Sequence, residues 1–388
     1  GPWRSPDAVQ RGSVINGAYP GDPLSPGFAS TPDANRLPID KAGSLARIPA
    51  LPLSYADALP FLAALKGETV PQSWRGALPA TYRFGPGPAV RLEVKSSWDT
   101  ITIYDVIATL PGGVYKDEWV VRGNHHDGWV YGAQDPHSGH AAMLEEARAL
   151  GALYRQGWRP KRTIVYASWD AEEQGTIGST EWMEAHLPEL QRKAVAYLNS
   201  DVITPGTVHI AGSQSLQGFA TDLARAVPDP VSGRDSLSQL RAEAAADARD
   251  GHPDSFHNRM LDKAGEGLLL SPPGYGSDHA AFVERSGVPV LTLEFGGDML
   301  AGGAYHSSYD NFAWFDRFGD PGYRYARAAA HLNGTAVIRL ADAEVLPFGF
   351  APAAEGLRVQ AGQLRQAAAQ RDAEVARDGR PAEVPLDL

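Results

Sequence analysis

The sequence predicts an α/β protein with a mostly parallel (mixed) central sheet flanked by helices. Between residues 102 and 198, short runs rich in β-branched and aromatic residues alternate with longer runs whose apolar residues recur at helical spacing. The order of strand, helix and strand is typical of right-handed βαβ units. The hydrophobic fraction is 43% over 388 residues, which is enough to bury a large core.

Three strands and one helix are expected in the first half of this pattern. Residues 102–108 and 119–123 are strand-like, and the second run is expected to be the more buried of the two. Residues 137–155 carry apolar side chains at helical spacing. Residues 163–168 then form a third strand-like run, so a parallel pairing with the second strand is expected.

The pattern continues with a helix and returns to strands. A helix is expected over residues 178–192, with Ser179 as a candidate N-cap, followed by a strand over residues 195–198. Farther along the chain, residues 288–293 are strand-like and residues 321–340 are expected to form a long helix.

Composition divides the chain into three parts. Residues 1–85 are dense in Pro and Gly, which favours irregular structure, apart from one short helix expected over residues 55–66. Residues 86–346 hold the strand and helix pattern. Residues 347–388 are rich in Ala, Gln, Arg and Glu, and an amphipathic helix is expected over residues 356–377. The chain opens with Gly and shows no signal segment, so we expect a processed chain or a fragment.

Composition and missing motifs exclude several classes of function. The formal net charge is −11, so nucleic acid is not an expected partner. The absence of cysteine excludes disulfide scaffolds, iron–sulfur clusters and cysteine nucleophiles. The sequence contains no apolar run of about 18 residues, so no membrane span is predicted. The His-Glu-x-x-His, Gly-x-Ser-x-Gly and phosphate-loop motifs are also absent, which disfavours the enzymes that depend on them.

Polar side chains follow each expected strand where it ends. Residues 124–127 (Asn-His-His-Asp) follow the second strand, and a loop then leads to Asp135. Residues 169–173 (Trp-Asp-Ala-Glu-Glu) follow the third strand, and residues 199–201 (Asn-Ser-Asp) follow the fourth. Because ligands of open α/β sheets gather beyond the carboxyl ends of the strands, we expect these side chains to converge. A Tyr-His pair at residues 305–306 cannot be placed by spacing alone.

Imidazoles and carboxylates at one sheet edge indicate a bound cation, because the carboxylates would otherwise repel one another. Nitrogen and oxygen ligands without thiolate suit Zn²⁺, with Mn²⁺ or Co²⁺ less favoured. Two zinc ions can share a bridging carboxylate and a bridging hydroxide, an arrangement that hydrolyses amides or phosphates. In the Glu172-Glu173 doublet, one carboxylate would bind metal while its neighbour accepts a proton from water. Each motif alone also fits a core histidine or an acid pair at a helix start.

Longer sequence motifs distinguish between these alternatives. The run over residues 157–182 contains Gly-Trp-Arg-Pro-Lys-Arg-Thr-Ile, Ala-Ser-Trp-Asp-Ala-Glu-Glu and Gly-Ser-Thr-Glu-Trp. Residues 124–139 contain Asn-His-His-Asp-Gly-Trp-Val and Asp-Pro-His-Ser-Gly, and residues 305–307 are Tyr-His-Ser. Two early segments, residues 9–12 (Val-Gln-Arg-Gly) and 21–24 (Gly-Asp-Pro-Leu), complete the set. Together the motifs closely resemble the glutamate carboxypeptidase and transferrin receptor family over nearly the whole chain.

The resemblance implies an aminopeptidase/carboxypeptidase-like fold with a co-catalytic pair of zinc ions. Asp135 would bridge the two metals. His125 and Asp201 would complete one site, and Glu173 and His306 would complete the other. Residues 86–346 would then be the zinc peptidase catalytic domain, between the end of an apical (protease-associated) domain (1–85) and the start of a C-terminal helical domain (347–388).

The resemblance also assigns roles around the metals. Glu172 would be the general base that activates the bridging water and then protonates the leaving amine. Tyr305 would hydrogen-bond the developing oxyanion, and Asp127 would fix the tautomer of the nearby imidazole. Three other histidines are weighed as rival ligands: His126, His137 and His279.

A structural calcium ion is a further implication of the resemblance. Glu181 and Glu184 lie three residues apart on one expected helix, so both can face one cation. The main-chain carbonyls of Ser25 and Phe28 would supply the remaining ligands, and oxygen-only ligation suits Ca²⁺. The alternative is an acidic helix face that is simply solvated.

The expected substrate pocket departs from the glutamate-preferring members of the family. Ser13 stands where they carry an Asn that helps to hold the substrate, and Thr292 and Glu294 stand where they carry two arginines. Gly276 and Ser277 belong to the same expected pocket. An acid in place of a guanidinium reverses the local charge preference, so the alternative is an aminopeptidase or a dipeptidase without acidic preference.

The main alternative from another class is a non-catalytic binding protein, because the transferrin receptor branch keeps the fold and loses the metal ligands. The presence of all six residues of the expected metal centre favours the zinc exopeptidase acting on a peptide or dipeptide. A homodimer is left open. A calcium site and the habit of the family favour a secreted, periplasmic or cell-surface protein.

Overall fold

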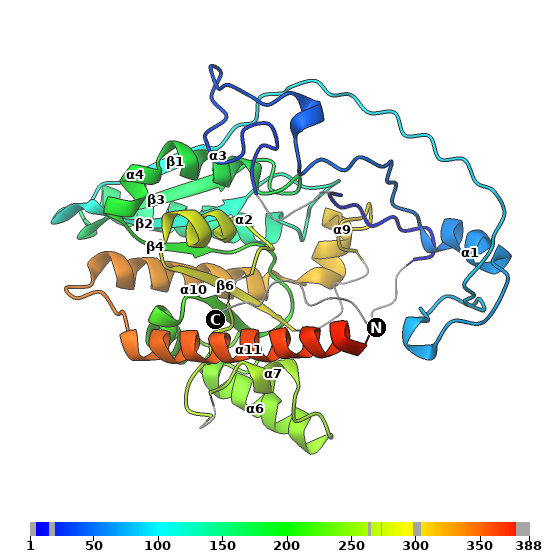
Figure 1. Cartoon of the computed structure of the whole chain (residues 1–388). Coiled ribbons are helices and arrows are strands. Elements are labelled where there is room, and N and C mark those ends of the chain that lie inside the picture. The colour runs from blue at the N-terminus through cyan, green and yellow to red at the C-terminus, as the bar shows by residue number, and fades with distance from the viewer. Residues whose placement is uncertain (1–4, 15–19, 263–264, 273, 298–303, 378–388) are drawn as a thin grey trace.

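The computed structural model describes residues 5–14, 20–262, 265–272, 274–297 and 304–377, and it confirms the α/β fold (Figure 1). Its centre is one six-stranded mixed sheet with the strand order β1-β3-β2-β4-β6-β5. The strands are β1 (Val106–Leu110), β2 (Tyr115–His125), β3 (Arg162–Trp169), β4 (Ala194–Asn199), β5 (Gly206–Gly212) and β6 (Val290–Gly297).

Four of the strands are parallel, which sets where their polar ends lie. Strands β3, β2, β4 and β6 run in one direction, whereas the edge strands β1 and β5 are antiparallel to their neighbours. The register pairs His125 with Trp169 and Gly123 with Asn199, so the carboxyl ends of β2, β3 and β4 meet at one edge of the sheet.

Neighbouring residues of a strand point to opposite sides of the sheet, so both faces carry apolar side chains. Helices cover both faces. The helices are α1 (Tyr55–Ala64), α2 (His137–Arg155), α3 (Ile177–Ala185), α4 (Leu187–Lys193), α5 (Gln217–Ala226), α6 (Ser236–Arg249), α7 (Phe256–Arg259), α8 (His279–Ala281), α9 (Phe312–Trp314), α10 (Arg324–Asp342) and α11 (Phe350–Arg377). Val120 packs into an apolar cluster with α2, α5, α6 and α10. Val121 packs into a second cluster on the opposite face with α3, α4 and α8.

The helix expected over residues 178–192 is wrong in one respect, because the structure breaks it into α3 and α4 at His186. Pro188 has no backbone N–H to donate to the Glu184 carbonyl, and its ring would clash with that carbonyl, so α3 cannot continue through it and Pro188 lies in the first turn of α4. Ser179 is not an N-cap, since α3 begins at Ile177 after Thr176. Ser179 is instead buried inside the helix.

Most other elements lie within a few residues of their expected positions. The expected strand over residues 102–108 is observed four residues later, as β1, and the helix expected over residues 356–377 begins earlier, at Phe350. Strand β5 and helices α5 and α6 were not among the expected elements. Most residues of β5 are buried and they do not alternate with exposed ones, so this edge strand lacks a period-2 signal.

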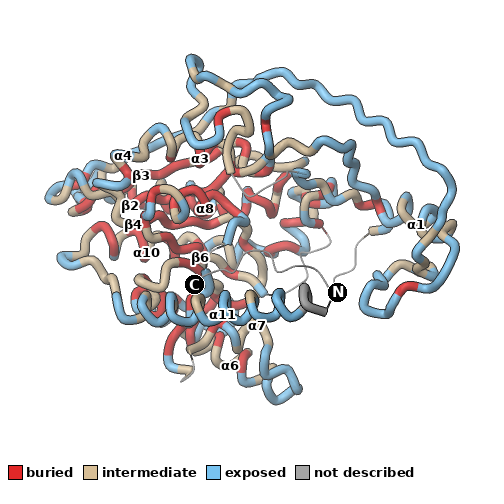
Figure 2. Tube along the Cα trace, viewed as in Figure 1, coloured by how far each residue is buried: buried red, intermediate tan, exposed pale blue. Residues whose placement is uncertain are grey.

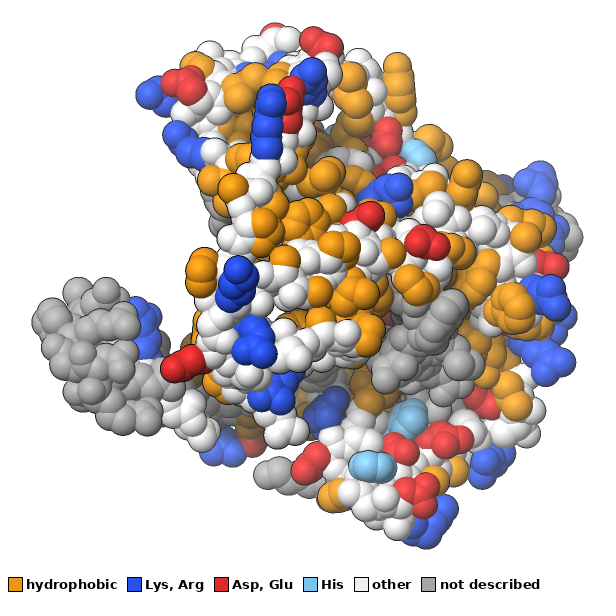
Figure 3. Space-filling model, turned by 90° about the vertical axis from the view of Figure 1, so that its right-hand side faces the viewer, with side chains coloured by type: hydrophobic (Ala, Val, Ile, Leu, Met, Phe, Trp, Pro, Cys, Tyr) orange, Lys and Arg blue, Asp and Glu red, His pale blue; other side chains and the backbone are white. Residues whose placement is uncertain are grey.

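The irregular N-terminal part runs over the surface of the α/β body. Residues 86–104 carry no helix or strand, and nearly all of them are exposed (Figure 2). Large apolar side chains stay exposed there and in the preceding residues, in contrast to the buried strands, and they contribute to the hydrophobic surface in Figure 3. Examples are Ile48, Leu51, Phe61, Trp74, Phe84 and Trp98. None of the described helices is long and apolar enough to cross a membrane.

Candidate metal centre and substrate pocket

The side chains expected to bind metal meet beyond the carboxyl ends of the parallel strands. His125 is the last residue of β2, Asp201 follows β4, and Glu173 lies in the loop after β3. Asp135 immediately precedes the turn into α2. A Cβ atom at Gly139 in α2 would lie 2.2 Å from the carbonyl oxygen of Asp201, so only glycine lets this helix approach so closely.

Two groups of three potential ligands share one carboxylate. His125 Nε2 lies 3.0 Å from Asp201 Oδ1 and 3.5 Å from Asp135 Oδ1. On the other side, His306 Nε2 lies 3.0 Å from Asp135 Oδ2 and 3.1 Å from Glu173 Oε2. Within each group the ligand atoms lie within 4.8 Å of one another. Asp135 therefore turns one oxygen toward each group.

The charges of these groups fit divalent cations. Burial acts to raise the pKa of Asp135, but hydrogen bonds from the two histidines lower that pKa to about 2. Burial acts to lower the pKa of His306, whereas its bonds to Asp135 and Glu173 raise that pKa to about 10. Without a metal, protons on the imidazoles balance the buried carboxylates. Nitrogen and oxygen donors at this spacing, with no thiolate, would hold Zn²⁺ in place of those protons.

Glu172 lies beside both groups but belongs to neither. Its Oε2 atom is 3.9 Å from His125 Nε2, and its side chain is only 12% exposed. Burial raises the pKa of Glu172 well above its ordinary value, and the negative charges of Asp201 and Asp278 act in the same direction. A carboxylate in this position can exchange a proton with a molecule bound at the metal centre.

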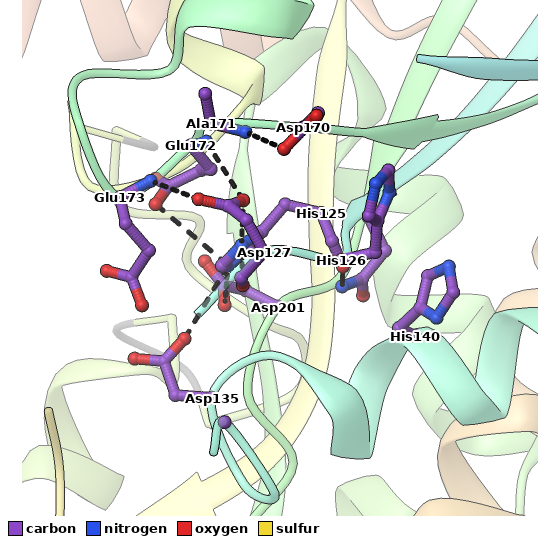
Figure 4. Close-up of polar contacts among 12 residues, drawn as sticks. His125, His126, Asp127, Asp135, His140, Asp170, Ala171, Glu172, Glu173 and Asp201 are labelled. Atoms are coloured by element: carbon purple, nitrogen blue, oxygen red, sulfur yellow. Dashed lines mark hydrogen bonds and ion pairs between the residues drawn. The ribbon is translucent and has the colours of Figure 1, made fainter. Parts of the chain in front are cut away.

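Asp127 connects the end of β2 to the Glu172-Glu173 loop (Figure 4). His125 Nδ1 lies 3.1 Å from the carbonyl oxygen of Asp127 and 3.2 Å from its Oδ1 atom. A carbonyl oxygen can only accept, so Nδ1 carries the proton and Nε2 faces the metal centre. The carboxylate of Asp127 also accepts hydrogen bonds from the amides of Glu172 and Glu173, at 3.0 and 3.2 Å.

The N-terminal segment holds the other side of the centre. His306 Nδ1 lies 3.0 Å from the carbonyl oxygen of Arg11, and the Arg11 amide donates to the carbonyl of His306 at 2.9 Å. Ser13 Oγ donates to the carbonyl oxygen of Glu173 at 2.9 Å. His306 has a φ of +56°, a left-handed conformation that costs a non-glycine residue energy and that these contacts hold in place.

Asp310 contacts the backbone of the shared ligand, which the sequence did not indicate. Its carboxylate accepts from the amides of Gln134 and Asp135 at 2.7 and 3.0 Å, and so positions the shared ligand. An aspartate four residues after His306 carries no motif of its own, so the sequence held no signal for this role.

The rival histidines lie outside both ligand groups. His126 Nδ1 lies 2.8 Å from Ser168 Oγ, and His137 Nδ1 lies 2.6 Å from the carbonyl oxygen of Gly132. His279 lines the pocket, and its Nδ1 atom is 3.4 Å from Thr292 Oγ1. These contacts account for the three imidazoles without a metal.

A pocket of about 680 Å³ opens over the metal centre. The structure places all of the expected pocket residues and Tyr305 in its lining: Ser13, Gly276, Ser277, Thr292 and Glu294. The Tyr305 ring stacks on His306 at 3.7 Å between centroids, and burial raises the pKa of its hydroxyl. Trp129 and His209 also line the pocket and were not anticipated.

The expected calcium residues lie where the N-terminal segment meets α3. Glu181 accepts hydrogen bonds from the amides of Asp22 and Ser30, at 2.7 and 2.5 Å, and burial raises its pKa to about 7. Glu184 is almost fully buried, 3.8 Å from an Arg285 nitrogen. The calcium site stays a prediction.

Comparison with known proteins identifies the family. Residues 105–318 match peptidase family M28, in agreement with the motifs. The chain is 37% identical over 368 residues to a probable glutamate carboxypeptidase of Arabidopsis thaliana, with 93% of this chain and 49% of that protein covered. It is 35% identical over 382 residues to the aminopeptidase NAALADL1 of Mus musculus, with coverages of 93% and 49%. The chain thus spans about half the length of these relatives.

Among solved structures, a zinc aminopeptidase from Bacillus subtilis aligns with a TM-score of 0.42 and 18% identity, over 62% of this chain and 50% of that chain. The family match covers more than half of the 388 residues and includes His125, Asp135, Glu173, Asp201 and His306. The chain therefore belongs to peptidase family M28.

Proposed function

We propose that the chain is the catalytic part of a di-zinc exopeptidase that hydrolyses peptide bonds. The observation that carries the proposal is Asp135, whose two oxygens face two separate groups of nitrogen and oxygen ligands. When bound, two Zn²⁺ ions would polarise the scissile carbonyl and lower the pKa of the attacking water. The family membership and the names of the relatives support the same activity.

Glu172 moves the proton in this proposal. The oxygen of water attacks the carbonyl carbon while Glu172 takes one of the water protons. The carbon–nitrogen bond then breaks, and Glu172 delivers that proton to the leaving amine, so that the carboxylate is regenerated. Its side chain is only 12% exposed, which supports both steps, because a proton held there is shielded from exchange with bulk water.

Two neighbours assist the reaction. Tyr305 lines the pocket beside His306, where its hydroxyl can donate to the oxyanion that forms on the carbonyl oxygen. Asp127 keeps the His125 ring oriented through its Nδ1 atom, and its bonds to the Glu172 and Glu173 amides keep both carboxylates in place.

The relatives include a probable glutamate carboxypeptidase and an aminopeptidase, so similarity alone leaves the attacked end of the peptide open. A non-catalytic binding protein is the alternative from another class. It has no need of a buried Glu172 beside two complete ligand groups, which favours the enzyme.

The proposal keeps a structural Ca²⁺ ion at Glu181 and Glu184. Glu181 joins α3 to residues 22–30 through the amides of Asp22 and Ser30, and Glu184 lies almost fully buried on the same helix, near Arg285. Calcium is expected to raise the thermal unfolding temperature of the wild type and to leave that of Glu184→Gln unchanged. Homodimerisation and an extracellular or periplasmic location stay predictions.

Removal and return of zinc test the proposed function. The chelated protein is expected to lose hydrolysis of a panel of di- and tripeptides, and added Zn²⁺ is expected to restore it. A preparation that contains no transition metal and still hydrolyses these peptides at the full rate would contradict the proposal.

A further inference from the structure

The described residues that line the substrate pocket include no Lys or Arg that could receive a carboxylate. Five carboxylates line the same space: Asp135, Glu172, Glu173, Asp201 and Glu294. A substrate that placed a terminal carboxylate or an acidic side chain here would therefore meet negative charge without a guanidinium or ammonium partner.

Glu294 is the carboxylate that the metal centre does not use. Two divalent cations would neutralise the three ligand carboxylates and Glu172. Glu294 belongs to neither ligand group, and its side chain is only 16% exposed. It lies close to the centre, because it lines the same pocket as Asp201, Glu172 and Asp135.

His209 is the side-chain neighbour of Glu294 in the pocket wall. The two residues are directly paired across the antiparallel strands β5 and β6, so their side chains point to the same face of the sheet. His209 Nδ1 lies 3.8 Å from Glu294 Oε2, which is too far for a direct hydrogen bond. The ring of Phe256 lies 5.3 Å from the His209 ring and holds it at the wall. Because the Glu294 carboxylate makes no direct hydrogen bond to His209 and lines the pocket, it can bind a further charged partner.

We infer that Glu294, beside His209, is a specificity site for a positive charge at the amino end of the substrate. The cation is the α-ammonium group of the first residue or the basic side chain of that residue. The inference rests on the proposed peptidase function and adds the attacked end and the charge class: an aminopeptidase mode that disfavours acidic first residues.

The test uses the full zinc-loaded chain and four tripeptides. X-Ala-Ala with X as lysine, norleucine or glutamate varies the first side chain, and N-acetyl-norleucine-Ala-Ala removes the α-ammonium group. Glu294→Gln removes the charge and keeps the shape, and Glu68→Gln removes one exposed charge outside the pocket lining as the matched control. Zinc content and circular dichroism establish that each variant is folded and loaded.

The variants separate the two sources of the cation. If Glu294 binds the α-ammonium group, Glu294→Gln lowers kcat/KM about 10-fold for all free-amine substrates, and N-acetylation lowers the wild-type value at least as much. If it binds a basic side chain, Glu294→Gln lowers the ratio of lysine to norleucine kcat/KM about 10-fold. The inference fails if the glutamate peptide is the best substrate, or if Glu294→Gln changes none of these values more than Glu68→Gln does.

A binding measurement separates this inference from the proposed function. Calorimetry with lysinamide, norleucinamide and N-acetyl-norleucinamide reports recognition of the cation without hydrolysis. Cleavage of no peptide, together with binding that Glu294→Gln weakens about 10-fold, would overturn the peptidase and keep the cation site. If the binding affinity depends on neither acetylation nor the charge of the side chain, the cation site alone would be overturned.

Discussion

The imidazole of His306 contacts the backbone of Arg11, with its Nδ1 atom 3.0 Å from the Arg11 carbonyl oxygen, although the two residues are 295 positions apart. A carbonyl oxygen only accepts, so Nδ1 is protonated and Nε2 faces Asp135 and Glu173. The irregular N-terminal segment is thus part of the metal centre, because it fixes the tautomer and the direction of one ligand.

Arg11→Pro tests this relationship, because it removes the amide that donates to the His306 carbonyl. The expected result is a loss of about 10- to 100-fold in zinc affinity at the site that contains His306. Zinc retained against a graded series of chelators measures it. Arg11→Ala keeps both backbone hydrogen bonds and is the matched control. Equal zinc retention by the two variants would show that the backbone contact does not matter.

Glu172→Gln tests the general base. The amide is isosteric and belongs to neither ligand group, so both zinc ions are expected to stay bound. Because an amide cannot accept the water proton, kcat is expected to fall by a factor of about 100 to 10,000. Zinc analysis and steady-state kinetics on the same preparation check both parts. Normal turnover with zinc bound would remove Glu172 from the mechanism.

Asp135 and Asp201 are expected to differ in how many metals they control. Asp135 contributes an oxygen to each ligand group, whereas Asp201 contributes to one. Asp135→Ala should therefore abolish both sites, and Asp201→Ala should leave about one zinc ion per chain from about two in the wild type. Metal analysis after gel filtration gives the counts. Identical zinc contents in the two variants would contradict a bridging role for Asp135.

The sequence predicted the sheet edge because its evidence is local. His125, Glu172 and Asp201 each lie at the end of a strand or within three residues of it, and parallel strands bring their carboxyl ends together. His306 lies in no such position, and only the family resemblance attached it to the centre.

Contacts between distant segments of the chain could not be predicted from the sequence. Asp310 positions Asp135 by accepting hydrogen bonds from backbone amides. Because a backbone amide does not depend on the side chain, no residue type in the sequence indicates this contact. His209 reaches Glu294 through the pairing of β5, an edge strand that was not expected. The roles of these residues depend on register and loop path, which no local pattern of residue types encodes.

A buried ion pair of Arg122 and Glu146 joins β2, whose last residue is His125, to α2. Both side chains are buried, with Arg122 Nε 3.2 Å from Glu146 Oε2. Arg122 also donates to Ser200 Oγ at 2.7 Å, next to Asp201, and so ties β2 to β4 below their polar ends. Tyr166 donates to the other Glu146 oxygen at 2.8 Å.

Glu146→Ala would leave the Arg122 guanidinium buried without its carboxylate, so a loss of about 3–5 kcal/mol in the free energy of unfolding is expected. Glu145→Ala is the control on the same helix: its pair with Arg148 is exposed, and its removal should cost no more than about 0.5 kcal/mol. Urea denaturation of the chelated proteins measures both without the contribution of bound zinc. Since Arg122 holds Ser200 beside a metal ligand, Glu146→Ala should also weaken zinc binding while Glu145→Ala does not. A stability loss with unchanged zinc affinity would show that the ion pair stabilises the core but does not support zinc binding.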